Sequence, residues 1–140
     1  MIYGEGKIML VDDEDIVREV SALLIKNLGY NVIEFSNGAD CIEYYKNHTR
    51  EVSAVILDLI MPGMSGYEVF NELKNINHNV KVLLFSGYST SDEVQKAMDN
   101  GAAGFLQKPA KKEILSQQLA KIAGKSVFHR TSDNEPEYKS

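Results

Sequence analysis

The chain has 140 residues and 44% hydrophobic content, which suits one domain with a real core and excludes a disordered or fibrous protein. Twenty acidic against fifteen basic residues give a net charge of −5, which argues against a nucleic-acid-binding surface. The single cysteine, Cys41, excludes an internal disulfide framework, and we interpret it as a small buried hydrophobic residue. Without a membrane-length apolar stretch or a signal-peptide pattern, we expect a cytoplasmic protein with no membrane insertion.

Short apolar runs alternate with segments of helical period, which is typical of β/α units that feed one parallel sheet. Strands are predicted at residues 8–11, 31–35, 52–57, 80–85 and 104–106. The first helix places Val17, Val20, Leu24 and Leu28 on one face and ends at Gly29. Further helices are predicted at 38–46, 66–75, 91–100 and 111–123. The fold class is therefore α/β, with five helices flanking a five-stranded parallel sheet.

The composition divides the chain into three segments. Residues 1–6 form an N-terminal lead, and residues 7–123 carry the alternating pattern of one domain. Residues 124–140 contain few large apolar side chains and have no period, so we interpret them as a flexible tail or linker.

Polar residues follow four of the five predicted strands. Asp12 and Asp13 follow the first strand, Asp58 the third, Ser86 the fourth and Lys108 the fifth. In an open parallel sheet, ligands bind beyond the carboxyl ends of the strands. This shared location predicts a single site built from all of these side chains.

The chemistry of these residues suits a divalent cation and a phosphoryl group. Two carboxylates ~4 Å apart repel each other by roughly 4 kcal/mol at an effective dielectric constant of about 20, so a cation must compensate them. Oxygen ligands without histidine or cysteine favour Mg²⁺, with Mn²⁺ as an alternative. Asp58 could then act as a nucleophile that forms an aspartyl phosphate, with Lys108 and Ser86 binding the phosphoryl group.

Four segments together resemble the CheY-like receiver domain of response regulators in two-component signalling. They are IMLVDDE at 8–14, VILDLIMPGMSG at 55–66, LFSGY at 84–88 and GFLQKP at 104–109. Each motif alone is weak, but their order and spacing over about residues 7–123 are highly specific. The resemblance implies a flavodoxin-like, doubly wound sheet with strand order 2-1-3-4-5.

The resemblance also implies a role for each acidic residue. Asp58 matches the phospho-acceptor, which receives its phosphoryl group from a histidine kinase or a histidine phosphotransfer domain. Asp13 matches the direct Mg²⁺ ligand and Asp12 the ligand that acts mainly through water. The backbone carbonyl of Ile60 and the Asp58 carboxylate complete the implied protein ligands.

The remaining matched residues imply a switch. Ser86 matches the hydroxyl that turns toward the phosphoryl group, and Lys108 the cation that holds a phosphoryl oxygen. The peptide bond before Pro109 is usually cis in this family, and Phe105 matches its aromatic switch residue. The output face would comprise helix 91–100, strand 104–106 and helix 111–123, where a partner or a second receiver could bind.

Two bulky residues, Ile60 and Tyr88, stand where side chains of this family border the site entrance. Neither could orient an attacking water, so we hypothesise slow self-dephosphorylation. The turn at 86–89 resembles receivers of hybrid sensor kinases, in which case the tail would be a linker.

Other interpretations compete with a phosphorylated receiver. Asp12 and Asp13 alone could cap the first helix, which would stabilise it by roughly 0.3 to 1 kcal/mol per charge. A haloacid-dehalogenase-type aspartyl-phosphate hydrolase typically carries a second aspartate two residues after its nucleophile, where this chain has Ile60. A pseudo-receiver that binds partners without phosphorylation is disfavoured because every matched site position is filled.

Overall fold

The computed structural model describes residues 2–87 and 92–123. Strands and helices alternate along the chain throughout this part. Their bounds are β1 (Lys7–Val11), α1 (Asp15–Asn27), β2 (Asn31–Phe35), α2 (Gly38–His48), β3 (Val52–Asp58), α3 (Gly66–Ile76), β4 (Val82–Ser86), α4 (Asp92–Asp99), β5 (Gly104–Gln107) and α5 (Lys112–Ala123).

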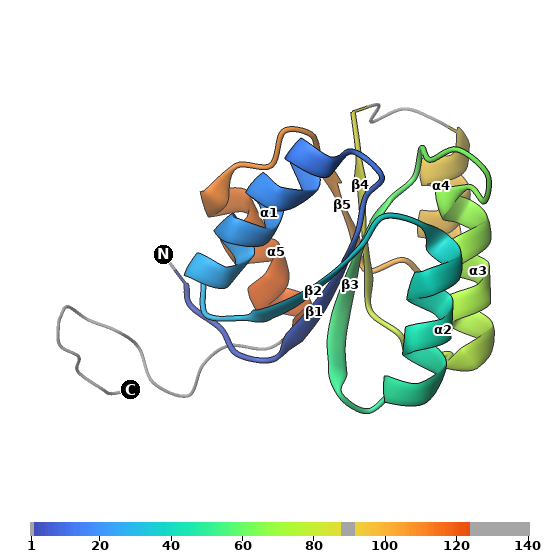
Figure 1. Cartoon of the computed structure of the whole chain (residues 1–140), viewed down its shortest axis with the longest axis horizontal. Coiled ribbons are helices and arrows are strands. Elements are labelled where there is room, and N and C mark those ends of the chain that lie inside the picture. The colour runs from blue at the N-terminus through green and yellow to red at the C-terminus, as the bar shows by residue number, and fades with distance from the viewer. Residues whose placement is uncertain (1, 88–91, 124–140) are drawn as a thin grey trace, which may run out of the picture.

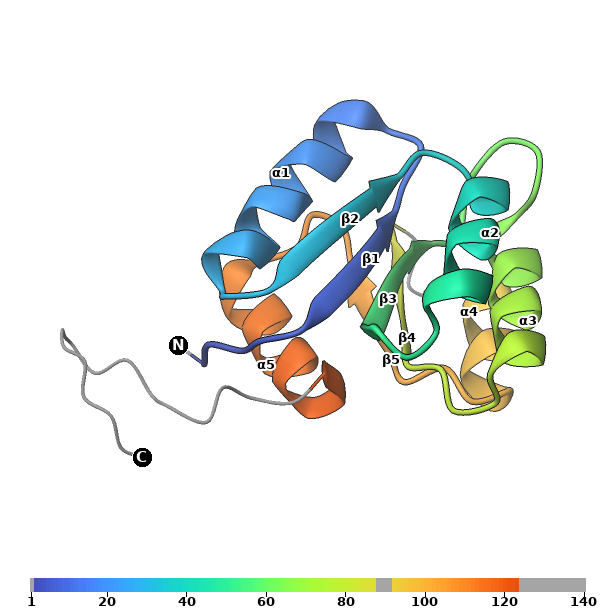
Figure 2. The same cartoon turned by 60° about the horizontal axis from the view of Figure 1, so that its bottom comes forward.

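All five strands are parallel and lie in the order β2-β1-β3-β4-β5. Helices α1 and α5 cover one face of the sheet, and α2, α3 and α4 cover the other (Figure 1). Figure 2 shows the same three layers after rotation, with the arrowheads of the strands at one edge. The flavodoxin-like fold predicted from the sequence is therefore confirmed.

The central strands separate two hydrophobic cores. Along β1, Ile8 and Leu10 point into the core beneath α1 and α5, whereas Met9 and Val11 point into the core beneath α2, α3 and α4. Because successive strand residues point to opposite faces, a strand covered on both sides must be apolar throughout. This explains the unbroken apolar runs of β1, β3 and β4.

The starts of α2 and α3 follow the capping rules. The Ser65 side chain accepts a hydrogen bond from the backbone N–H of Glu68, and the Glu68 carboxylate accepts one from the N–H of Ser65, which together form a capping box for α3. The side chain of Asn37 accepts from the N–H of Asp40 and caps α2. These caps fix the loops that lead from the carboxyl ends of the strands into the helices.

The face of α1 differs from the predicted one. Val20 is 54% exposed, whereas the core side of the helix is formed by Ala22 and Ile25 together with Leu28. Of the predicted repeat, Val17 and Leu24 do pack against this core and Leu28 is buried, so only Val20 was wrong. Val20 belongs to a solvent-facing apolar stripe with Ile16 and Leu23. Tyr88 and the 124–140 tail lie outside the described residues.

The N-terminal lead packs onto the domain before β1. The backbone N–H of Ile2 donates to Ser116 Oγ at 3.0 Å, and the same hydroxyl donates to the carbonyl oxygen of Ile2 at 2.7 Å. The N–H of Gly4 donates to the Leu28 carbonyl, which joins the lead to the end of α1. Among the helices of residues 2–87 and 92–123, none has the length and apolar character needed to cross a membrane.

Candidate functional site

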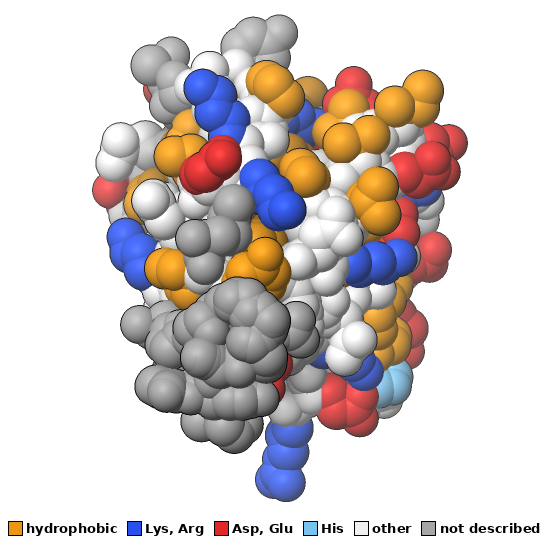
Figure 3. All heavy atoms as spheres, turned by 90° about the vertical axis from the view of Figure 1, so that its left-hand side faces the viewer, with side chains coloured by type: hydrophobic (Ala, Val, Ile, Leu, Met, Phe, Trp, Pro, Cys, Tyr) orange, Lys and Arg blue, Asp and Glu red, His pale blue; other side chains and the backbone are white. Residues whose placement is uncertain are grey.

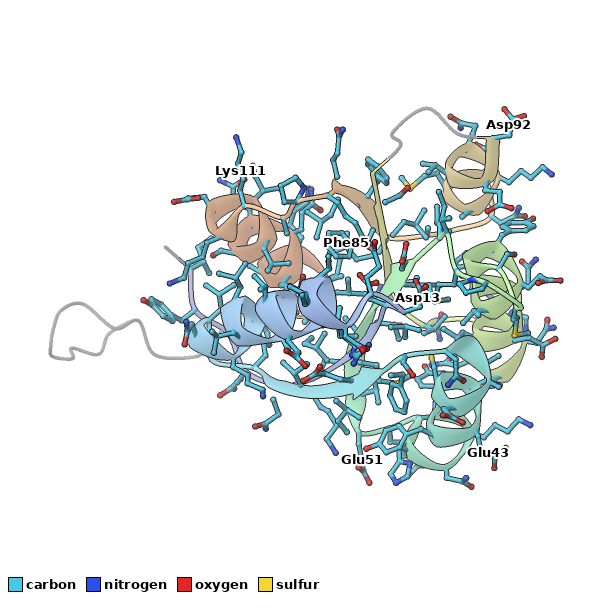
Figure 4. All side chains as sticks on the ribbon, turned by 45° about the horizontal axis from the view of Figure 1, so that its top comes forward. Asp13, Glu43, Glu51, Phe85, Asp92 and Lys111 are labelled. Atoms are coloured by element: carbon cyan, nitrogen blue, oxygen red, sulfur yellow. The ribbon has the colours of Figure 1, made fainter. Side chains whose placement is uncertain are left out.

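The polar residues expected at the strand ends lie together at one edge of the sheet. Asp58 and Ser86 are the last residues of β3 and β4, and Asp12 and Lys108 directly follow β1 and β5. Figure 4 shows Asp13 at the centre of this edge, with Lys111 and Asp92 toward its two sides. A cavity of about 730 Å³ opens here, and its lining residues are Asp13, Glu14, Asp58, Ile60, Met61, Pro62, Ser86, Gly87 and Lys108.

Lys108 is the cation at the centre of the site. Its Nζ lies 3.0 Å from Asp12 Oδ2, 3.1 Å from Glu14 Oε1 and 3.2 Å from Asp58 Oδ2. Its side chain is only 16% exposed, because the stem runs into the site and the ammonium lies 5.1 Å from the centre of the Phe85 ring. One cation therefore compensates three carboxylates.

The backbone around Lys108 holds its side chain at this place. The Lys108 N–H donates to the carbonyl of Ser86 at 2.9 Å, which continues the pairing of β5 with β4. The Lys108–Pro109 peptide bond is cis, as the family resemblance implied.

Burial and charge act in opposite directions on Lys108. Burial lowers the pKa of its ammonium, but the carboxylates of Asp12 and Glu14 and the charge of Asp58 outweigh burial and raise the pKa above its usual value. The side chain therefore stays positively charged in this site at neutral pH.

The Asp58 carboxylate is 2% exposed and has two hydrogen-bond donors. Oδ1 accepts from the N–H of Ile60 at 3.1 Å, and Oδ2 accepts from Lys108 Nζ. Burial, with a smaller contribution from the nearby Asp12 charge, raises the pKa of Asp58 to about 7, although the Ile60 N–H and Lys108 act in the opposite direction. Asp58 is thus a buried carboxylate that titrates near neutrality.

Asp12 is fully buried and incompletely satisfied. Its Oδ1 accepts from the N–H of Glu14 at 2.9 Å. Its Oδ2 has only the ion pair with Lys108, and no hydrogen bond within the described part of the chain reaches it. Buried carboxylate oxygens normally have hydrogen-bond partners, so this atom is a ready ligand for a cation or its bound water.

The site fits a hard divalent cation. Carboxylate oxygens of Asp12, Glu14 and Asp58 all lie within 4.8 Å of one another. Oxygen-only ligands of this kind suit Mg²⁺. Asp13 is partly buried and lines the cavity, but it does not belong to this tightest group.

Glu14 was missed by the sequence analysis. The available signal was its position directly after the Asp12-Asp13 pair, at the entry to α1. Glu14 is the N-cap residue of α1, yet its side chain makes no cap hydrogen bond. Its carboxylate contacts Lys108 instead, so Glu14 contributes to the site and not to the capping of α1.

Arg18 was also missed, although it fixes the acidic loop. Its NH1 donates to the carbonyl of Asp12 at 2.8 Å. NH2 pairs with Asp15 at 2.9 Å, and Nε pairs with Glu34 of β2 at 3.2 Å. The guanidinium, with a side chain 13% exposed, therefore ties the loop after β1 to both α1 and β2.

The other expected residues lie at or near the same edge. The Ser86 side chain is buried and lines the cavity, and Ile60 is 55% exposed at its rim. Phe105 is partly buried against the core beneath α2, α3 and α4.

Cys41 is buried, and burial raises the pKa of its thiol to about 12, which confirms its interpretation as a small hydrophobic residue.

The parallel sheet and the polar side chains at its carboxyl edge place the chain among the open α/β proteins, in which ligands bind beyond the carboxyl ends of the strands. Residues 8–120 match the model of the response regulator receiver domain. The chain therefore belongs to the receiver domain family of response regulators. This membership argues against the haloacid-dehalogenase-type alternative.

Curated relatives and a solved structure agree with this membership. The chain is 34% identical over 122 residues to a cyclic di-GMP phosphodiesterase of Thermotoga maritima, covering 87% of this chain and 32% of the relative. It is 31% identical to chemotaxis protein CheY of Bacillus subtilis, covering 82% and 95%, and 31% identical to sensor kinase CckA of Brucella abortus, covering 77% and 11%. A receiver domain structure from Clostridium thermocellum superimposes with a TM-score of 0.80 at 26% identity, covering 84% and 94%.

The chain thus spans about a third of the Thermotoga maritima relative and nearly all of the Bacillus subtilis one.

Proposed function

We propose that the chain accepts a phosphoryl group on Asp58 from a phosphohistidine donor. Phosphorylation then alters the face of α4, β5 and α5, which a partner protein recognises. The observation that supports this proposal best is the contact between Lys108 Nζ and Asp58 Oδ2 inside a buried cluster of carboxylates. A buried carboxylate alone would be a weak nucleophile and a poor anion site. The fixed ammonium beside it can bind the incoming phosphoryl oxygen.

The transfer itself needs few protein groups. An oxygen of the Asp58 carboxylate attacks phosphorus, the bond between phosphorus and the donor imidazole nitrogen breaks, and that nitrogen keeps the electron pair. Mg²⁺, when bound, would offset the charge of the phosphoryl oxygens and the carboxylates. Asp12, Asp13, Asp58 and the Ile60 carbonyl would hold it, with Glu14 beside them. The protein is then a signalling phospho-acceptor whose own catalysis is limited to self-phosphorylation from small donors and slow self-dephosphorylation.

The phosphoryl group changes the charge of a site that already carries several acids. A phosphorylated side chain adds about −1.5 to −2 charges, so Lys108 and the Ser86 hydroxyl would move toward the new oxygens. Phe105 on β5 would fill the space that the loop after β4 leaves. The face of α4, β5 and α5 would then present the altered surface to a partner or a second receiver.

Exposed apolar side chains at the cavity and in the first turns of α1 and α5 suit contact with the donor protein. Ile16 in the first turn of α1 is 76% exposed, Ile60 is 55% exposed and Ile114 in the first turn of α5 is 43% exposed. Figure 3 views the face of α1 and α5, where hydrophobic side chains lie among lysines and arginines. A histidine kinase or a histidine phosphotransfer domain could bury this rim while its phosphohistidine enters the cavity.

Intact-mass measurement tests the proposal directly. The chain is incubated with Mg²⁺ and either acetyl phosphate or a phosphohistidine domain, and we expect one added phosphoryl group. Asp58→Asn should show none, whereas the matched change Asp99→Asn on α4 should be phosphorylated like the wild type. An unmodified wild type with both donors, or an equally modified Asp58→Asn, would overturn the proposal.

Phosphoryl loss should be slow once the donor is removed. Ile60 at the rim has no polar group with which to orient a water at phosphorus, and Tyr88 lies outside the described residues. Rapid loss from the wild type that Tyr88→Ala does not accelerate would contradict this part of the proposal.

A further inference from the structure

Glu14 stands at the mouth of the cavity. Its side chain is 60% exposed, whereas Asp12 and Asp58 are almost completely buried behind it. It lines the cavity together with Lys108, to which it is joined by the 3.1 Å contact between Oε1 and Nζ. A donor that approaches Asp58 through this opening therefore passes a negative charge before it reaches the ammonium.

The position of the Glu14 carboxylate is not explained by the helix that it begins. An acidic N-cap residue can place its side chain on the free N–H groups of the first turn. Glu14 makes no such bond, although α1 starts at the next residue. Its side chain instead joins a site that already contains three other acids, Asp12, Asp13 and Asp58.

Of the three carboxylates around Lys108, Glu14 can release the ammonium at the lowest cost. Water cannot take the place of Lys108 beside Asp12, because the Asp12 side chain is 0% exposed. Water can hydrate Glu14 as soon as Lys108 turns to a phosphoryl oxygen. Glu14 could therefore hold Lys108 before transfer and release it during transfer, while its own charge stays at the mouth.

We propose that Glu14 determines which phosphoryl donors the site accepts, by repelling small dianionic donors more strongly than donors with a less negative carrier. The inference rests on the proposed phosphorylation of Asp58 and adds selectivity to it. Repulsion between like charges grows with the charge of the donor and is felt over the Debye length, about 8 Å at physiological salt.

Two small donors, acetyl phosphate and phosphoramidate, differ in net charge. Acetyl phosphate is a dianion near neutral pH, and its transfer breaks the phosphorus–oxygen bond and releases acetate with the electron pair. Phosphoramidate is a zwitterion of net charge minus one, and its transfer breaks the phosphorus–nitrogen bond and releases ammonia with the protons already on nitrogen. In both cases the new bond joins phosphorus to an oxygen of Asp58, so only the donor changes.

The test compares rate constants of self-phosphorylation with the two donors at saturating Mg²⁺ for each variant. Glu14→Gln should raise the ratio of the acetyl phosphate rate to the phosphoramidate rate about threefold to tenfold. Glu14→Asp keeps the charge with a shorter reach and should leave the ratio near that of the wild type. Glu72→Gln, an exposed residue of α3, makes the same change in net charge away from the site and should leave the ratio unchanged.

High salt supplies a second readout that a purely structural role would not give. The difference between the wild type and Glu14→Gln should shrink at 1 M NaCl, where the Debye length is about 3 Å. An equal ratio in the wild type and Glu14→Gln, or an equal rise in Glu72→Gln, would overturn the selectivity role. A wild type that is not phosphorylated by either donor, or by a phosphohistidine domain, would instead overturn the proposed function.

Discussion

The ammonium of Lys108 lies 3.2 Å from Oδ2 of Asp58 and shares its charge with Asp12 and Glu14. Two of these three carboxylates are buried, so the fold concentrates negative charge that one lysine offsets. We therefore expect the buried carboxylates to lower the stability of the metal-free protein, while they provide ligands for a cation.

Lys108→Met should destabilise the metal-free protein strongly at pH 8. The variant keeps the length of the side chain but leaves Asp12 and Asp58 without a cation, which costs about 3 kcal/mol for a broken buried pair. At pH 5 the loss should be smaller, because a protonated Asp58 no longer needs the ammonium. Urea denaturation in EDTA measures both values, and Lys81→Met at an exposed position serves as control. Equal losses at the two pH values would contradict this account.

Asp58→Asn should stabilise the metal-free protein at pH 8. The pKa of Asp58 is raised to about 7 by burial, above the value near 4 expected in the unfolded chain. The folded state thus binds the proton more tightly, and the contribution of Asp58 to stability falls as pH rises from about 4 to about 7. An amide avoids this cost, so the stability of the variant relative to the wild type should rise by about 4 kcal/mol between pH 4 and pH 7. A stability difference that does not change with pH would show that Asp58 titrates normally.

Mg²⁺ should raise the stability of the wild type. A ligand that binds only the folded state stabilises it by about 1.4 kcal/mol at a concentration ten times its dissociation constant. Thermal unfolding with and without the ion, at pH 8, gives the shift. In Asp12→Asn the shift should be strongly reduced, because the buried Oδ2 is replaced by a group that binds cations poorly. The same shift in the wild type and in this variant would place the cation elsewhere.

Ser116→Ala should loosen the N-terminal lead. The hydroxyl is 2% exposed and binds both the N–H and the carbonyl of Ile2, so its loss leaves two backbone groups without that partner. We expect a loss of about 1 to 2 kcal/mol in the free energy of unfolding. Hydrogen exchange at the start of the chain should also become faster. Ser36→Ala, at an exposed position, is the matched control and should change neither quantity.

Ile16→Ser should slow transfer from a phosphohistidine protein without slowing transfer from acetyl phosphate. Ile16 is 76% exposed and makes no core contact whose loss would alter the cavity. Its removal affects only a partner that buries the rim, and we expect about a threefold to tenfold lower rate, which corresponds to part of one apolar side chain. The transfer rates of the variant and the wild type are measured with a phosphohistidine protein and with acetyl phosphate. An equal effect on both rates, or on neither, would contradict a docking role for Ile16.

The sequence alone was sufficient for the fold and for most of the site. Apolar runs without alternation occur where strands are covered on both faces, and helical periods occur between them, so the order of β and α elements was predictable. Asp58, Ser86 and Lys108 were predictable as neighbours because parallel strands end at a common edge. The bounds differed by only a few residues, for example at β4, which runs from Val82 to Ser86.

Only the tertiary structure decided which acids meet Lys108 and which residues hold them in place. Glu14 rather than Asp13 joins the tightest cluster, Arg18 ties the acidic loop to Glu34 of β2, and Ser116 of α5 binds the lead. Residue type and spacing determine the element on which a side chain lies. The direction in which that side chain turns depends on partners far away in the sequence, and those partners become neighbours only when the sheet and helices assemble.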